Sequence, residues 1–309
     1  MGKGKKGFWE FLILAGICMF VAGLFIRDGR GQNESPGLSD WREGNENQEG
    51  LWGKNTEQDR EPEEKPEGIL QIAGSTSMEK VTWALAESFM EEYPGVTVTV
   101  ECVGSSAGIE AVAEGRVQVG NASRTLKEEE RKMGLVETFL ATDGIVVCVD
   151  PSNQVQNLTK KELADIYTGR IVNWQQVGGE DIPIVVIGRE AGSGTRDAFE
   201  TYLGLAGQCR HANELDSAGA VLARIATTAG AIGYLSMAEA DERVKRLWLD
   251  GVEPCVEQVA EGRYPLSRPF VMVTGGEGTG QDLLVDTWLT FVRGRKGQKI
   301  MAHIGLAGP

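Results

Sequence analysis

The feature that most restricts how this chain can fold is a regular alternation of short apolar runs with helical stretches, which begins near Gly68. One helical face is marked by apolar residues spaced three, four and four positions apart: Met78, Val81, Leu85 and Phe89. Strands are expected at residues 69–73, 96–100, 145–149, 184–187, 231–235 and 270–274, and further helices at 109–113, 195–203, 217–228 and 283–292. The β-branched runs 145–149 and 184–187 are typical of buried parallel strands. The alternation therefore predicts an α/β fold with mainly parallel strands.

Three loops rich in glycine and hydroxyl residues each follow an expected strand and open an expected helix. They are Gly74–Ser77, Gly104–Gly108 and Gly188–Arg196. In open α/β sheets, ligands bind at the carboxyl ends of strands, where a helix N-terminus offers free backbone N–H groups and a positive dipole end. Glycine allows the backbone to approach a ligand closely, and Ser and Thr hydroxyls add neutral donors. Together the loops predict a site for a small tetrahedral oxyanion.

Each loop also has a purely structural interpretation. Thr76 fits a capping box with the acid three residues later, and Ser105 and Ser106 can cap a helix as well. Arg189 can make a two-pronged contact with an oxyanion, or it can form an ion pair with Glu190. The third loop lacks the spacing and the lysine of a P-loop, so a nucleotide is not expected there.

The charge and the reactive residues of the chain exclude several functions. The net charge of −14 argues against nucleic acid as a partner, because a phosphate backbone needs neutralisation by Lys and Arg. The chain has only two histidines and none in the three loops, so we expect no metal, no cofactor and no hydrolase that uses Ser105 or Ser193 as a nucleophile. Of the five cysteines, Cys209 and Cys255 can pair if they lie outside the cell.

The N-terminus, residues 1–27, predicts a membrane anchor. Residues 1–7 carry three lysines and no acid, and residues 8–26 are apolar apart from Glu10. The basic end stays in the cytoplasm, so the rest of the chain is expected on the outer face of the membrane. Cys18 suggests a lipid anchor, but Ile17 stands where a lipobox needs a small residue. An uncleaved helix is therefore favoured over lipidation at Cys18 or a cleaved signal peptide.

Residues 28–67 predict a flexible acidic linker. Twelve acids and five bases give this segment a net charge of −7, half of the excess of the whole chain. Its few apolar residues cannot bury enough surface to fold alone, and its like charges extend it.

Several sequence motifs, in their order along the chain, resemble those of the PstS-like phosphate-binding proteins of ABC transporters. The resemblance covers residues 68–305 and rests on GSTSMEKV, VGSSAGIEAV, VGNASRTL, LTKKELADIYTGRIVNWQQVGG, IVVIGREAGSGTRDAFE and AGAIGYLS. It implies a two-lobed periplasmic-binding-protein fold of type II, with a crossed hinge and a ligand cleft between the lobes. Lobe I would comprise residues 68–143 plus 235–309, and lobe II residues 144–234.

The resemblance also implies a function and a set of ligand contacts. The protein would be a non-enzymatic, monomeric solute-binding protein that captures inorganic phosphate and delivers it to the transmembrane subunits of an ABC permease. The phosphate-binding residues carried over, or placed beside them, are Thr76, Ser77, Ser105, Ser106, Ser123, Arg124, Arg189, Ser193, Gly194 and Thr195.

Two positions depart from the pattern of many family members. Ser123 and Arg124 stand where these members have an acid that accepts the proton of hydrogen phosphate. Ala191 replaces an acid that holds the binding arginine in some members, so Glu190 or Asp197 is expected to pair with Arg189 instead.

Other functions on the same fold stay open from the sequence. The ligand can be another tetrahedral oxyanion, such as sulfate, molybdate or tungstate. A binding domain on a stalk also suits a phosphate sensor or an adhesion protein.

Overall fold

The computed structural model describes residues 65–276 and 282–308. These residues belong to one compact unit, Arg60–Pro309. The expected anchor and nearly all of the expected linker lie outside the described residues. Among the helices that are described, none is long and apolar enough to span a membrane.

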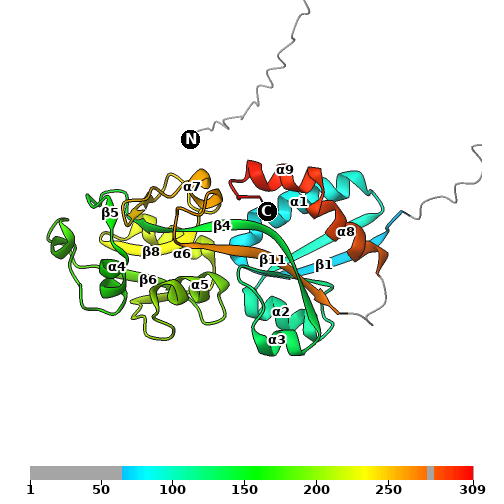
Figure 1. Ribbon diagram of the computed structural model, residues 1–309, viewed down its shortest axis with the longest axis horizontal. Coiled ribbons are helices and arrows are strands. Elements are labelled where there is room, and N and C mark those ends of the chain that lie inside the picture. The colour runs from blue at the N-terminus through cyan, green and yellow to red at the C-terminus, as the bar shows by residue number, and fades with distance from the viewer. Residues whose placement is uncertain (1–64, 277–281, 309) are drawn as a thin grey trace, which may run out of the picture. The chain divides into compact units, whose positions relative to one another are not determined.

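The elements alternate along the chain much as the sequence predicts (Figure 1). The strands are β1 (Gly68–Gly74), β2 (Val96–Cys102), β3 (Val119–Ala122), β4 (Leu135–Val149), β5 (Asn157–Leu158), β6 (Val185–Arg189), β7 (Asn213–Leu215), β8 (Ala231–Ser236), β9 (Lys245–Arg246), β10 (Trp248–Leu249) and β11 (Ser267–Gly275). The helices are α1 (Glu79–Glu92), α2 (Ser105–Ala113), α3 (Glu128–Lys132), α4 (Lys160–Tyr167), α5 (Gly194–Leu203), α6 (Ala218–Thr227), α7 (Val256–Ala260), α8 (Leu283–Arg293) and α9 (Arg295–His303), with 3₁₀ turns η1 (Thr76–Met78) and η2 (Trp174–Val177).

The main sheet is mixed, with the strand order β2-β1-β3-β11-β4-β8-β6-β7. β1, β2 and β3 are parallel neighbours, and so are β6, β7 and β8. Between these two groups, β11 and β4 run antiparallel to each other and to their outer neighbours β3 and β8. The prediction of an α/β fold is confirmed. The prediction of a parallel strand at 145–149 is wrong, because this run is the end of β4, and burial on both faces gives the same apolar sequence in either direction.

Two large hydrophobic cores lie toward opposite ends of β4. One is built from residues such as Leu70, Phe89 and Trp288, with Phe89 and Trp288 packed edge to face at 5.1 Å. The other contains the end of β4 from Ile145, together with α5, α6 and β8. This second core also includes buried residues between Leu235 and Leu266, a stretch that the sequence analysis assigned to lobe I.

β4 connects the two cores because it is fifteen residues long. Leu140 packs into the first core and Ile145 into the second. In between, Asp143 lies opposite Arg268 of β11, and both side chains are buried. A buried ion pair therefore sits where the chain passes from one core to the other.

Candidate functional site

Five buried hydroxyl groups form a connected cluster where the two cores meet. We call Ser75, Ser77, Ser105, Ser123 and Thr195 the hydroxyl cluster. Ser75 Oγ lies 2.9 Å from Ser77 Oγ and donates to Ser123 Oγ at 3.0 Å. Ser105 Oγ and Ser123 Oγ are 3.2 Å apart, and Ser77 Oγ and Thr195 Oγ1 are also 3.2 Å apart. No member is more than 4% exposed, so these hydroxyls are shielded from bulk water.

The cluster is positioned by strand ends and helix starts. Ser75 and Ser77 follow β1, Ser105 is the first residue of α2, and Ser123 follows β3. Thr195 comes from the first turn of α5, which belongs to the second core. The sequence prediction that the three loops converge is confirmed for these residues.

Gly194 permits the close approach of α5 to the cluster. A Cβ atom added at this position would lie 2.6 Å from both Ser105 Oγ and Ser123 Oγ, and 3.1 Å from the backbone of Ser123. Any side chain here would therefore push the hydroxyls apart. The resemblance also identified this residue as a ligand contact.

Thr76 does not cap its own helix, although its sequence fits a capping box. Neither η1 nor α1 has a side-chain cap, and the Thr76 hydroxyl instead accepts a hydrogen bond from the backbone N of Ala218 at 3.2 Å. Ala218 begins α6, so a fourth helix N-terminus reaches the site. Ser105 makes no cap either, whereas Ser193 caps α5 by accepting from Arg196 N.

Arg189, at the end of β6, is a buried arginine paired with the partly exposed Glu190. Its Nε and Nη2 donate to the two carboxylate oxygens of Glu190 at 2.9 and 2.8 Å, and Nη2 also reaches the carbonyl of Asp216 at 3.4 Å. The expectation that Glu190 replaces the missing acid is confirmed as a contact. Asp197 is not the partner of Arg189.

Asp197 faces Arg124 instead, at 3.2 Å from Nε, without the alignment of a hydrogen bond. The terminal nitrogens of Arg124 donate to both oxygens of Glu130 at 2.8 and 2.7 Å, and one also donates to Ser106 Oγ at 3.1 Å. Burial would raise the pKa of Glu130, but the bond and the charge of Arg124 outweigh it, and the pKa lies below its ordinary value. The charge of Arg124 is thus compensated locally.

The sequence analysis missed an arginine that contacts the hydroxyl cluster. Arg268 donates from Nη2 to Ser77 Oγ at 3.1 Å, and from Nε and Nη2 to Asp143 at 3.1 and 3.0 Å. Its Nη1 is buried and has no hydrogen-bond partner within the described residues. Asp143 also accepts from Ser236 Oγ at 2.8 Å. The sequence signal was present, since both charges stand inside apolar strands.

Burial acts on both members of this pair. It raises the pKa of Asp143 and lowers the pKa of Arg268, while the charge of each partner opposes the change in the other. The nearby Arg189 guanidinium contributes to lowering the pKa of Arg268. Two buried cations are therefore close enough to interact, an arrangement that an anion between them would stabilise.

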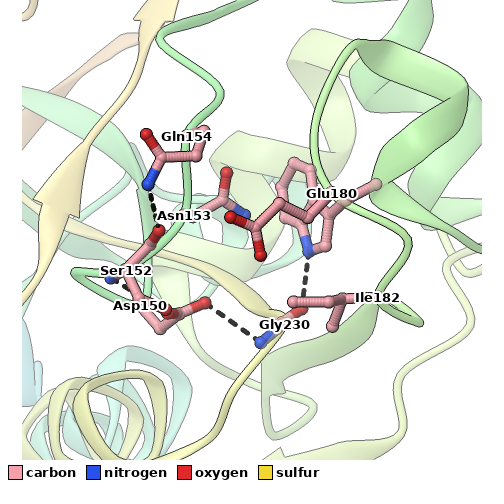
Figure 2. Close-up of a pocket in the computed structure, with 8 residues that line it drawn as sticks. Asp150, Ser152, Asn153, Gln154, Glu180, Ile182 and Gly230 are labelled. Carbon is pink, nitrogen blue, oxygen red and sulfur yellow. Dashed lines mark hydrogen bonds between the residues drawn. The ribbon is translucent and has the colours of Figure 1, made fainter.

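One cavity among the described residues borders this site, and a smaller pocket is lined by other residues. A wide cavity is lined by Arg124, Asp197 and Arg268 among others, and so borders the site. Figure 2 shows a smaller pocket lined by Asp150 and Gly230, among others, and Asp150 accepts from Gly230 N. Trp174 also lines this pocket, and its Nε1 donates to Gly230 O. None of the predicted site residues lines the smaller pocket.

The four described cysteines are free, so the pairing of Cys209 with Cys255 that the sequence left open is not formed.

Comparisons with known proteins agree over the folded part of the chain. A family model described as a PBP superfamily domain matches residues 59–295. The phosphate-binding protein PstS of Bacillus subtilis is 38% identical over 240 residues, which cover 77% of this chain and 79% of that protein. PstS of Borreliella burgdorferi is 27% identical over 254 residues, covering 78% and 90% of the two chains.

Solved structures show the same fold. A protein from Clostridium perfringens, assigned to phosphate ABC transport as a substrate-binding protein and solved with bound phosphate, has a TM-score of 0.75 and 38% identity; the match covers 78% of this chain and 100% of that one. An ABC-type phosphate transport receptor from Vibrio cholerae has a TM-score of 0.65 and 33% identity, with coverage of 78% and 100%. The expected fold class is thereby confirmed.

Proposed function

The chain belongs to the PBP superfamily and, within it, to the PstS phosphate-binding proteins, and from this premise we propose that it binds inorganic phosphate and passes it to an ABC permease. The observation that carries the proposal is the hydroxyl cluster. Each hydroxyl can donate or accept, so the five groups satisfy one another and can also turn their hydrogens toward an oxyanion. The helix N-termini beside them add backbone donors and positive dipole ends.

The arginines beside the cluster explain how an acidic protein can hold a phosphate anion. Arg189 and Arg268 are each paired with a carboxylate, so the site is not strongly cationic before the ligand arrives. An anion would gain hydrogen bonds from two guanidinium groups while the paired carboxylates keep those groups in place. Neutral hydroxyls and compensated arginines together suit a ligand that must be bound and then released.

Phosphate and sulfate differ in a proton that the hydroxyls can recognise. Hydrogen phosphate carries a proton near neutral pH and sulfate does not. The resemblance implies a proton-accepting acid in this segment of many family members, where this chain has Ser123 and Arg124, and the Ser123 hydroxyl can accept that proton as well as donate. We therefore place phosphate first, and another tetrahedral oxyanion such as sulfate or molybdate second.

Calorimetric titration with phosphate, sulfate and molybdate tests the ligand. We expect phosphate to bind tightest, and tighter binding of sulfate would contradict the proposal. Arg189→Ala removes a buried charge and strands Glu190, so affinity should fall by roughly two orders of magnitude or more. Arg116→Ala, which changes an exposed arginine paired with Glu114, is the matched control and should bind as the wild type does.

We assign each of the two cores to one lobe, and we propose that the two lobes close over the ligand. The donors come from both, since Thr195 lies on α5 and Ala218 on α6, two helices of the second core, and Ser77 lies beside the first. A ligand that contacts both lobes stabilises the closed form. The hinge would be the β4–β11 crossing, with lobe II running from Ile145 to Leu266, further than the sequence analysis placed its end.

The relatives that match are binding proteins, and we propose that this chain also acts without catalysis. Ser193 is engaged as a helix cap and Ser105 bonds to Ser123, so neither hydroxyl is paired with a base. Turnover of p-nitrophenyl phosphate that is lost in Ser193→Ala would contradict this. As a binding protein it would act as a monomer, and an equilibrium sedimentation experiment tests that directly.

We further propose that residues 1–27 hold the protein on the outer face of the membrane and that the acidic linker sets the binding unit away from the surface. The supporting pattern is the basic N-terminal end followed by the apolar run of residues 8–26. The full chain should stay in the membrane fraction after alkaline extraction, and Cys18→Ser should stay there too. Release of the Cys18→Ser protein would favour the lipid anchor instead.

A further inference from the structure

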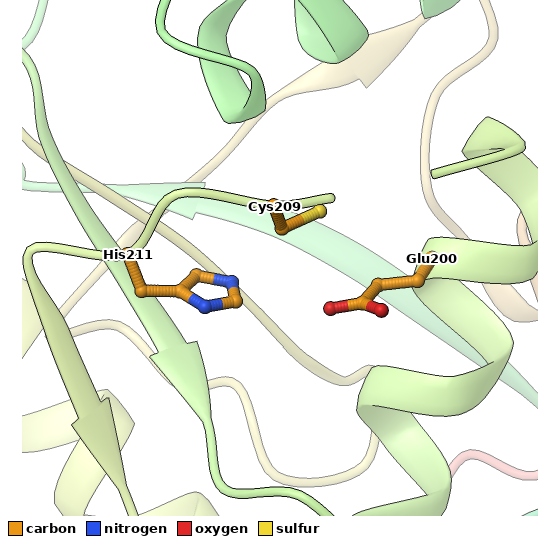
Figure 3. Close-up of side chains that lie close together, drawn as sticks. All are labelled: Glu200, Cys209 and His211. Atoms are coloured by element: carbon orange, nitrogen blue, oxygen red, sulfur yellow. The ribbon is translucent and has the colours of Figure 1, made fainter. Parts of the chain in front are cut away.

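Three metal-ligating side chains meet within the second core, away from the hydroxyl cluster. They are Glu200 of α5, Cys209 and His211, and one ligand atom from each lies within 4.8 Å of the others. Figure 3 shows the imidazole ring and the carboxylate facing each other, with the thiol beside them. The three residues come from a helix and from the loop after it, so the fold brings them together.

The imidazole of His211 is the strongest indication that a ligand belongs here. Its side chain is fully buried, and its Nε2 has no hydrogen-bond partner within the described residues. Its Nδ1 lies 3.2 Å from a carboxylate oxygen of Glu214. A carboxylate on one ring nitrogen fixes the ring orientation and leaves the other nitrogen for a metal.

The ring is held in this place by close packing against the backbone. A Cβ atom at Gly188 would lie 2.4 Å from Nε2 of His211 and 2.2 Å from its Cδ2. The glycine therefore makes room for the imidazole. A buried nitrogen without a partner, kept there by a specific glycine, costs stability unless something binds it.

The charges around the three ligands are suited to a dication. Glu200 and Glu214 carry two negative charges, and Arg196 pairs with both of them, at 2.7 and 3.1 Å. One negative charge is left over, and a thiolate at Cys209 would add a second. A divalent cation would then make the whole group neutral, with Arg196 still bound to its carboxylates.

We propose that Glu200, Cys209 and His211 form a binding site for a zinc-class divalent metal ion. Thiolate, imidazole and carboxylate are together the ligands that Zn²⁺ and Co²⁺ prefer, and water would complete four-coordination. The ion would tie the 204–211 loop to α5, the helix whose first turn carries Thr195. The proposal does not rest on phosphate binding.

Metal binding at this site must release a proton from Cys209. Burial raises the pKa of the Cys209 thiol to about 12, and it lowers the pKa of His211, so the thiol is protonated and the imidazole neutral near pH 7. The charged groups that act on these two side chains are Arg196, Glu200 and Glu214.

Cobalt and zinc titrations of the full chain test the proposal. The protein, as Cys18→Ser, is stripped with EDTA, kept reduced, and moved into a chloride buffer without phosphate. We expect one Co²⁺ per chain with a thiolate-to-cobalt charge-transfer band, displaced by one Zn²⁺. Cys209→Ser should lose the band, and His211→Gln should weaken binding at least a hundredfold.

Matched variants distinguish metal binding at this site from non-specific metal binding elsewhere on the chain. Cys255→Ser and His303→Gln change residues of the same type outside the cluster, and both should bind as the parent does. Absence of the cobalt band in the parent, or its persistence in Cys209→Ser, would overturn the proposal. Circular dichroism checks that each variant folds, and X-ray absorption showing no sulfur ligand on bound zinc would overturn it independently. Phosphate titrations of the same samples report separately on the proposed transport function.

Discussion

Gly194 is the residue at which the packing of the hydroxyl cluster can be tested most simply. We expect Gly194→Ala to lower phosphate affinity at least tenfold, about 1.4 kcal/mol, because the new methyl group would displace two hydroxyls. Gly219 lies within α6 with open space around its Cβ position, so Gly219→Ala is the matched control and should keep full affinity with equal or slightly greater stability. Calorimetry of both variants gives the answer, and equal affinities would contradict the packing argument.

Arg268 should contribute both to the stability of the fold and to the affinity for phosphate, and two variants can separate these roles. Arg268→Ala leaves Asp143 buried without its partner, which should cost roughly 3–5 kcal/mol of unfolding free energy. The double variant Asp143→Asn with Arg268→Gln removes both charges and should recover much of that stability. It should still bind phosphate at least tenfold more weakly than the wild type. Full affinity in a stable double variant would show that Arg268 acts only on the fold.

The carboxyl of Glu239 should make the stability of the folded protein depend on pH. Burial raises the pKa of its carboxyl to about 7, and one of its oxygens is buried without a partner. Because the folded protein holds this proton more tightly than the unfolded chain does, stability should fall as the pH rises from about 4.5 to 7. Glu239→Gln should remove that fall and raise stability at pH 8 by on the order of 1–2 kcal/mol. Urea unfolding at pH 5 and pH 8 measures it, and an unchanged pH dependence in the variant would contradict it.

At the residue scale, the sequence predicted the site where local pattern determined it. The loops that carry Ser77, Ser105 and Thr195 were predicted because each follows a strand and opens a helix, and the three residues themselves were carried over from the family resemblance. Arg268 stands out in the sequence only as a charge inside an apolar strand, and its pairing with Asp143 depends on the register of β11 against β4, which no local pattern encodes. The sequence analysis likewise expected no metal site. The juxtaposition of Cys209 and His211 with Glu200 becomes visible only when α5 and the loop after it are packed.

Among the elements, α5 connects the ligand site to the second core through its first turn. Ser193 caps this helix and Thr159 caps α4, each by accepting from a backbone N–H. We expect Ser193→Ala and Thr159→Ala to cost about 1 kcal/mol of stability each. Only Ser193→Ala should also weaken phosphate binding, because only α5 begins at the site. Calorimetry and urea unfolding of the pair test this, and an equal loss of affinity in both variants would argue against a local effect.

The existence of the strands could be predicted, but the direction of the central ones could not. Apolar runs mark buried strands well, and each expected strand is present. A run such as Ile145–Val149 is apolar because it is covered on both faces in the middle of the sheet, and that holds for parallel and antiparallel neighbours alike. The antiparallel β4–β11 pair, which joins the two groups of parallel strands, arises from connections far apart in the chain.

The two cores are connected at the site by few direct contacts. Ser77 meets Thr195, and Thr76 meets the first N–H of α6, through single hydrogen bonds of 3.2 Å. The backbone N of Ser106 also donates to the carbonyl of Gly192 at 3.1 Å, and Arg124 faces Asp197 at 3.2 Å. Net contributions of such bonds are about 1 kcal/mol each, so they hold the lobes together only weakly. A bound anion that accepts from both sides would add more than these contacts provide. Ligand binding and the stability of the whole folded unit should therefore be linked.

This linkage gives a prediction for the folded unit in solution. At phosphate concentrations a hundredfold above Kd, the unfolding free energy should rise by about 2.7 kcal/mol, because only the folded state binds the ion. Urea unfolding with phosphate, with sulfate and with chloride alone measures the rise at micromolar concentrations, where sulfate has no general stabilising effect. Arg189→Ala should show no rise with phosphate, whereas Arg116→Ala should respond as the wild type does. An equal rise with sulfate would mean that the hydroxyl cluster recognises the shape of a tetrahedral anion and not the proton of hydrogen phosphate.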